Sequence, residues 1–378
     1  MLGFSSYSNL LNEANLVGGI GHIEHPSDRV FDGEKAARHA VSTIRGVALG
    51  RTPVTRKIDD RMSFQVIRDQ QGRVGVKYKG SGSTYNFSND EIERQHGQKP
   101  YLVKPLRELL AHAPKVIPSR QGEWQGGYMS APEDRTEKGG KTGHTPNTIS
   151  YSVKKDSPEG KKLAKSKVSM TIHTELKGPN RKPHPIEDQS EFRDHPDVHL
   201  VNHVVRKEDQ KLSPEAKKAV LRHISSAQTL MKGHDYSHLT DHDKTLRTYV
   251  NSTVDSGERT HVEGYKKHLA DRWEREIAKV KTEKAKKQKM DQRDAALAHV
   301  DANREAFQRS LDIHHHIQQA TNTLADNMNR TAHGGVSTEI GGKPSGGEGF
   351  VAKGLKVVNR DEFSKANRER SKILRAKK

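Results

Sequence analysis

The sequence predicts an α+β protein in which an antiparallel-rich sheet is interrupted by a large helical insertion. Apolar and polar residues alternate in residues 63–67 and 74–78, and a turn-rich spacer between them predicts a β-hairpin. From about residue 198 to 330 the apolar residues follow the helical period instead. Strand-like residues return at 350–358. The sheet is therefore expected to draw on two distant parts of the chain.

Breaks in composition predict where these parts begin and end. Four prolines among many charges in residues 179–196 mark the exit from the first part, and paired glycines in 331–347 mark the return. The expected parts are an N-terminal lead (1–19), the first part of the core (20–185), a helical insertion (186–330), the second part of the core (331–363) and a basic tail (364–378).

Two helix starts are predicted from capping signals. Asp32 is expected to cap a helix from about residue 33 to 45, which Gly46 and Gly50 would end. Ser213 is followed by proline and an acid, the order typical of a helix N-terminus.

The charge balance favours a polyanionic partner. The 378 residues include 66 Lys and Arg against 48 Asp and Glu, giving a formal net charge of +18, while only 31% of residues are hydrophobic. Nucleic acid is the simplest such partner, because phosphate contacts release counterions. The alternative is that lysine-rich helices are merely solvated. The absence of cysteine excludes disulfides and thiolate chemistry. No membrane-spanning apolar run and no signal-peptide pattern is found, so we expect a soluble intracellular protein.

A lysine precedes the predicted hairpin. Lys57 and Asp59 are two residues apart at the start of a probable strand, so their side chains share one face. This is one way to hold a lysine nucleophile beside a nucleotide phosphate; a surface Lys–Asp pair is the simpler alternative. Near the C-terminus, Glu348 is followed by a glycine and apolar residues, and Lys356 lies in a strand-like segment.

These segments resemble the covalent nucleotidyltransferases, the ATP-dependent DNA and RNA ligases and mRNA capping enzymes. Lys57-Ile58-Asp59 resembles their KxDG nucleophile motif, Glu348-Gly349-Phe350-Val351 their EG-apolar-V motif, and Leu355-Lys356-Val357-Val358 their final lysine-bearing strand. The resemblance implies a ligase-like core, with a lysyl-AMP intermediate at Lys57 and ATP and Mg²⁺ as cofactors. Glu348 would coordinate metal or nucleotide, and Lys356 would contact the α-phosphate.

Further residues are expected around the nucleotide. Asp59 and Arg61 flank the lysine, and Arg61 would add positive charge. Lys79 opens a glycine-serine loop, residues 79–83, whose amides are able to cradle phosphate, although such a loop is often a simple turn. Two positions depart from the family pattern. Asp60 replaces a glycine, and Gly127 replaces an acid, which leaves an inactive or repurposed member as an alternative.

The chain also resembles an uncharacterised family of tailed-phage proteins, through residues 21–26, 147–151 and 173–175. This resemblance implies the host cytoplasm, or the virion, as location. The alternative function is therefore a non-catalytic nucleic-acid-binding or virion accessory phage protein that retains a degenerate ligase-like fold.

Lysines in a polar helical stretch are the candidate nucleic-acid contacts. Lys284, Lys286, Lys287 and Lys289 form this run, and a solvated helix face is the alternative. The chain contains 22 histidines, and His195, His199 and His203 are spaced as on one helix face. Packed or solvated histidines explain them better than a metal site, because Pro196 interrupts that helix.

Overall fold

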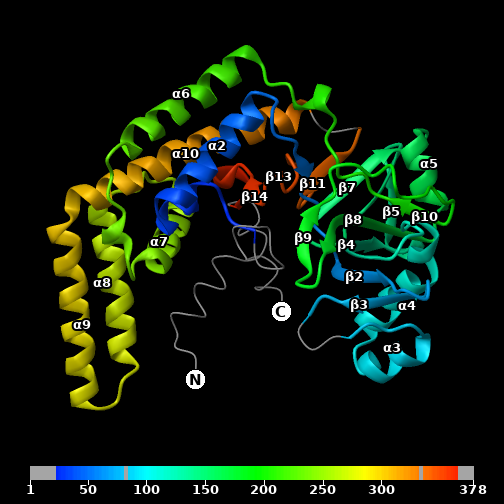
Figure 1. The fold of residues 1–378 in the computed structure, drawn as a ribbon, viewed down its shortest axis with the longest axis horizontal. Coiled ribbons are helices and arrows are strands. Elements are labelled where there is room, and N and C mark those ends of the chain that lie inside the picture. Colours follow the sequence, from blue (N-terminus) through cyan, green and yellow to red (C-terminus); the bar gives the residue numbers. More distant parts are fainter. Residues whose placement is uncertain (1–22, 81–83, 332–334, 365–378) are drawn as a thin grey trace.

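The computed structural model describes residues 23–80, 84–331 and 335–364 (Figure 1). The fold is mixed α+β, 49% helical and 21% strand, with mostly antiparallel sheets, as the sequence predicts. Strands of the described residues form three sheets. The expected N-terminal lead, nearly all of the basic tail and the serines of the 79–83 loop lie outside the described residues.

The largest sheet has six strands and contains the predicted hairpin. Its strands follow the order β10-β8-β4-β2-β3, and β9 also pairs with β8. Only the β10–β8 pair is parallel among these. The strands are β2 (Met62–Arg68), β3 (Val74–Tyr78), β4 (Gly122–Ser130), β8 (Val168–Lys177), β9 (Lys182–Pro185) and β10 (Val198–Leu200).

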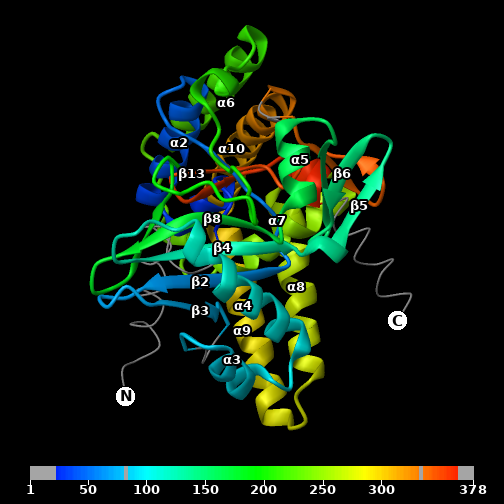
Figure 2. The same cartoon turned by 90° about the vertical axis from the view of Figure 1, so that its right-hand side faces the viewer.

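One face of this sheet is apolar and the other polar. Phe64, Val66 and Ile172 lie in a hydrophobic core with the helices α3 (Asn89–His96) and α4 (Pro100–His112). Figure 2 shows these helices on one side of the sheet. Alternate residues face the other way; there the buried Gln65 donates to the buried Gln125 at 3.2 Å. The helices α3 and α4 therefore cover the apolar face of this sheet, and polar side chains lie on the opposite face.

Two smaller sheets join distant parts of the chain. The five-stranded sheet, in the order β12-β11-β7-β6-β5, packs near α5 (Pro158–Lys165), and the three-stranded sheet has the order β1-β13-β14. Their strands are β5 (Arg135–Lys138), β6 (Lys141–His144), β7 (Ile149–Lys154), β11 (Ser337–Ile340), β12 (Lys343–Pro344), β1 (Thr55–Arg56), β13 (Phe350–Ala352) and β14 (Leu355–Val357). In each of these sheets, a strand from before residue 155 pairs with a strand from after residue 336. β1 pairs with β13, and β7 pairs with β11.

The remaining helices pack around a second hydrophobic core. This core includes Ile44, Ile224, Phe307 and Leu311, and also Phe350 from β13. The helical stretch therefore shares its core with an N-terminal helix and with the three-stranded sheet. The helices are α2 (Glu34–Ala48), α6 (Pro214–Met231), α7 (Asp243–Ser256), α8 (Val262–Ala278), α9 (Glu283–Ala302) and α10 (Arg304–Thr331). Five short 3₁₀ turns and the π-helical turn η6 (Arg360–Ser364) complete the described elements; η1 spans Ser27–Asp32.

The predicted helix starts differ in outcome. At α6, the backbone N–H of Ala216 donates to the Ser213 hydroxyl at 3.2 Å, which confirms the predicted cap. At α2 the predicted helix is confirmed, but its predicted cap was wrong: Gly33, not Asp32, precedes the helix. The helix also continues through Gly46 and ends just before Gly50. The carboxylate of Asp32 pairs with Arg29 and Arg247 instead.

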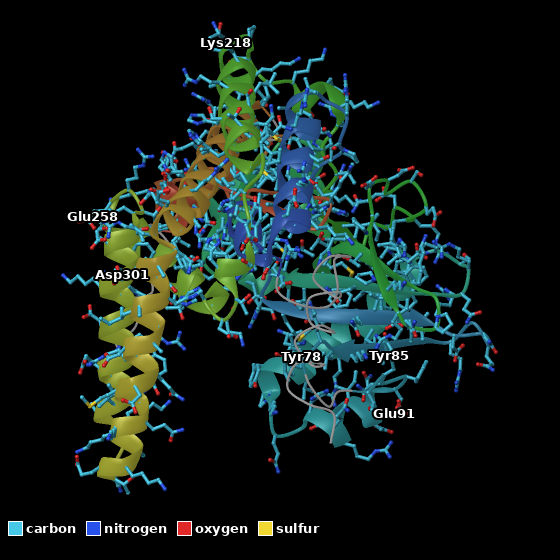
Figure 3. The ribbon with its side chains drawn as sticks, turned by 60° about the vertical axis from the view of Figure 1, so that its left-hand side comes forward. Tyr78, Tyr85, Glu91, Lys218, Glu258 and Asp301 are labelled. Carbon is cyan, nitrogen blue, oxygen red and sulfur yellow. The ribbon has the colours of Figure 1, made fainter. Side chains whose placement is uncertain are left out.

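Helices α8 and α9 form an arm that projects from the helical core (Figure 1). Only the base of the arm is anchored in that core, through Val262, Tyr265, Leu269 and Val300. Figure 3 shows Glu258 and Asp301 at this base, with the side chains of the arm projecting into solvent beyond them. No helix within the described ranges is long and apolar enough to cross a membrane.

Candidate nucleotide site around Lys57

Pairing between the two ends of the chain places Lys57 beside Glu348. The Lys57 backbone N–H donates to the Gly349 carbonyl at 2.8 Å, directly after the β1–β13 ladder. Gly349 has a φ of +96°, and a Cβ there would approach the Val357 carbonyl oxygen to 2.6 Å, so glycine is required. The Lys57 Nζ and the Glu348 Oε1 form an ion pair, and both side chains are mostly buried.

One carboxylate oxygen of Glu348 lacks a protein partner. Its Oε2 is buried and accepts no hydrogen bond from the described residues, and the same holds for Asn329 Oδ1. Both residues line one cleft with Lys57 and Tyr151. A buried acceptor without a donor is costly, so an arrangement of this kind indicates a position for a ligand, cation or water.

Lys356 lies next to this ion pair. It follows the first residue of β14, and its backbone N–H donates to the Glu24 carbonyl at 2.9 Å. Burial lowers the pKa of Lys356 to about 8, and the nearby positive charge of Lys57 adds to this effect, whereas Glu348 opposes it. The structure therefore brings Lys57, Glu348 and Lys356 together, although two of them come from the opposite end of the chain.

Asp59 connects the lysine segment to β7. Its backbone N–H donates to the Tyr151 hydroxyl at 2.7 Å. Its carboxylate accepts hydrogen bonds from Asn147 Nδ2 at 3.1 Å and from the backbone N–H of Thr148 at 2.9 Å. These contacts hold the loop after Lys57 in place.

Asp60 fills the space beside Gly127. A Cβ on Gly127 would lie 2.5 Å from the Asp60 Oδ2, so the aspartate fits only because position 127 is glycine. Burial raises the pKa of Asp60 to about 6, whereas a hydrogen bond from the Ser63 hydroxyl, at 2.9 Å, opposes that rise. The two departures from the ligase pattern are thus in contact, and a carboxylate is present beside β4 after all.

The contact between Asp60 and Gly127 leads to a prediction about the stability of single and double variants at these positions. Gly127→Asp alone is expected to destabilise the protein by about 1–3 kcal/mol, because the new side chain overlaps Asp60. The double variant Asp60→Gly/Gly127→Asp should recover most of this loss, since it exchanges the two side chains. Urea denaturation of the single and double variants measures both free energies of unfolding. If the single and the double variant were destabilised equally, overlap with Asp60 would not be the cause of the loss.

Lys79 and His173 complete the polar surroundings. Burial lowers the pKa of Lys79, and the nearby Asp60 opposes this shift. Burial also lowers the pKa of His173 to about 3, and positive charge on His203, Lys79 and Lys57 contributes. Lys57 and Lys79 therefore lie near the same neutral histidine. Sequence reasoning did not assign a role to His173 or Tyr151, and alternation in β7 and β8 alone could not single them out.

Arg61 and the four arm lysines, which the sequence also predicts as site residues, make their contacts away from the Lys57–Glu348 ion pair. The Arg61 guanidinium is turned to Asp134, at 2.7 Å, in an exposed ion pair. The four lysines lie on α9 in the projecting arm, on the other side of the molecule from the six-stranded and five-stranded sheets (Figure 1). There Lys286 pairs with Glu283 at 2.8 Å, and the Lys289 Nζ lies 5.3 Å from the Trp273 ring centroid.

The described part of the chain has no group of three or more His, Asp or Glu side chains placed to hold a metal ion. Glu348, the predicted metal ligand, is therefore not part of a group of three such side chains within the described ranges.

The fold and site define an α+β protein with a lysine–carboxylate pair held between its two chain ends. The chain belongs to a family of unknown function (DUF6267), whose model matches residues 71–372. This match contains Gly127, Glu348 and Lys356, and Lys57 precedes it. Searches of curated proteins and of solved structures gave no significant match.

Proposed function

We propose that the protein is an ATP-dependent nucleotidyltransferase of the RNA or DNA ligase type, with Lys57 as its nucleophile. The observation that carries this proposal is the ion pair between Lys57 and Glu348, next to Lys356 and in a cleft where one Glu348 oxygen has no partner. A mostly buried amine with a carboxylate and a second cation beside it suits attack on a phosphate.

In the first step, Lys57 Nζ attacks the α-phosphorus of ATP. A nitrogen–phosphorus bond forms, the bond from that phosphorus to the bridging oxygen breaks, and pyrophosphate leaves. The amine must lose a proton, and the carboxylate of Glu348 is in contact to accept it. Lys356 contributes positive charge near the α-phosphate.

In the second step, a 5′-phosphate oxygen of nucleic acid attacks the same phosphorus. The nitrogen–phosphorus bond breaks, which frees Lys57 and leaves AMP on the nucleic acid. A 3′-hydroxyl then displaces AMP and seals the strand. The arm lysines Lys284, Lys286, Lys287 and Lys289 are the proposed contacts for the phosphate backbone.

Glu348 is the residue of this site that fits a magnesium ion best. Its free Oε2 is a hard oxygen ligand, and Mg²⁺ is usually held by one or two carboxylates together with substrate phosphates and water. When bound, the ion would offset phosphate charge.

The second candidate function is nucleic-acid binding without catalysis, in a phage accessory protein. The net charge of +18 and the lysine-bearing arm favour it, and so does the unusual placement of the carboxylate at Asp60.

Incubation with α-³²P-labelled ATP and Mg²⁺ separates the two functions. Adenylyl transfer predicts label that stays on the denatured chain and is released by acid, as a phosphoramidate is. Chelation of the metal should prevent labelling. A chain that takes no label from ATP or GTP would overturn the enzymatic proposal and leave the binding function.

A further inference from the structure

A cleft between α2 and α6 is lined by basic side chains. It has a volume of about 830 Å³, and the turn between β13 and β14 closes one side. No aspartate or glutamate is among its lining residues. The basic lining residues are Arg38, Arg45, Arg51, Lys232 and Lys353.

Most of these charges have no partner among the residues that the structure describes. Arg38 pairs with Glu34 one helical turn away, in an exposed contact. Among the described residues, the side chains of the other four form no hydrogen bond or ion pair. Burial lowers the pKa of the neighbouring His39, and the positive charges of Arg29 and Lys353 lower it further. Uncompensated cations around one concavity raise the local concentration of anions.

The local backbone holds Arg51 at the cleft. After α2 the chain turns at Gly50, with a φ of +67°, and the backbone N–H of Arg51 donates to the Gly46 carbonyl at 2.8 Å. Gly46 has no side chain, and this allows Thr52 to pack against the helix. The bonds to Gly46 also satisfy a carbonyl at the C-terminal end of α2, which would otherwise repel an anion.

Lys353 reaches the cleft from a strained turn. Lys353 and Gly354 are the two central residues of the β13–β14 hairpin, and their φ angles are +45° and +74°. A turn of this kind favours asparagine or glycine at the first position. A lysine there costs conformational free energy, which points to a role for its charge. At α6, Arg309 Nη2 donates to the Lys232 carbonyl at 2.9 Å and so caps that helix end.

We propose that this cleft binds consecutive phosphates of a nucleic-acid strand. Arg38 and Arg45 are seven residues apart on α2, a rise of about 10 Å, so the charges span more than one phosphate group. The inference goes beyond the proposed function, because it requires no chemistry at Lys57. It adds a strand-binding surface to the contacts proposed for the arm lysines.

Fluorescence anisotropy with a labelled 20-nucleotide oligo(dT) tests the proposal on the full chain without ATP. Arg45→Glu/Arg51→Glu is expected to weaken binding by at least about tenfold and to reduce the salt slope of log K by about 2. The matched control is Lys217→Glu/Lys218→Glu, which changes the net charge equally at exposed positions of α6 outside the cleft (Lys218 in Figure 3). The control should bind within about threefold of the unmodified protein.

Equal losses in the two variants would overturn the proposal, because they would reflect net charge alone. Binding of dTMP that equals binding of the oligonucleotide would overturn it as well, since a single phosphate would then suffice. Thermal melting of each variant checks that the fold is retained. Labelling with α-³²P-ATP, measured in parallel, should persist in Arg45→Glu/Arg51→Glu, so that failure of either proposal is seen separately.

Discussion

Lys57→Ala is expected to abolish labelling by α-³²P-ATP, by roughly three orders of magnitude or more. The side chain that would form the bond to phosphorus is removed, and the nearby Lys356 lies on a different strand with its own partners. Lys57→Arg is the sharper variant. It keeps a positive charge for Glu348, but guanidinium stays protonated at all working pH values and cannot attack.

A control distinguishes loss of chemistry from loss of folding. Lys138→Ala removes an exposed lysine of β5 and should label at the level of the unmodified protein. Undiminished labelling of Lys57→Arg, with Lys138→Ala also unaffected, would exclude Lys57 as the nucleophile even if the protein binds ATP.

Arg360→Leu is expected to cost about 3–5 kcal/mol of unfolding free energy, the largest stability change we predict. The Arg360 Nη1 donates to the Asp28 Oδ1 at 2.7 Å, and both residues are almost fully buried. His314 Nε2 lies 3.1 Å from the same oxygen. Without Arg360, the Asp28 carboxylate would remain buried with its main counter-charge removed.

Guanidinium denaturation measures this change, and a second substitution tests its cause. Although burial alone raises the pKa of Asp28, Arg360 and His314 hold it well below its ordinary value of 3.8. This contribution is therefore present above pH 4 and is lost as the pH falls further. Asp28→Asn in the Arg360→Leu background should restore part of the stability. For comparison, removal of the exposed Lys155–Glu137 pair should cost less than about 1 kcal/mol.

Local sequence patterns were sufficient for several elements. The β2–β3 hairpin follows from alternation on both sides of a turn, and the start of α6 follows from Ser213 and the proline after it. The α2 boundaries were harder to predict. Gly46 is tolerated inside the helix because its missing side chain makes room for Thr52, a tertiary contact that residue preference does not reveal.

The candidate site was predictable only through motif resemblance. Lys57 and Glu348 were identified from short motifs, but their pairing depends on the β1–β13 ladder, which has only two residue pairs. No local pattern predicts that β11 pairs with β7 or that α2 shares its core with α10. The contact between Asp60 and Gly127 was equally hidden, because the two separate departures from the family pattern become related only when β2 and β4 lie side by side.

Because the two strands of the β1–β13 ladder are far apart in the sequence, the ladder also limits when the chain is able to fold during translation. Arg56 pairs with Phe350, which is translated about 300 residues later. At roughly 5–20 residues per second, β1 would wait on the order of 15–60 s for its partner. During that interval the edge of β1 that faces β13 is unpaired, and β1 has only its pairing with Val204 on the other edge. The six-stranded sheet is complete once residue 200 has emerged, so it is able to form earlier. Nascent chains stalled before residue 350 should therefore be cleaved by proteases near residue 57 while the sheet resists.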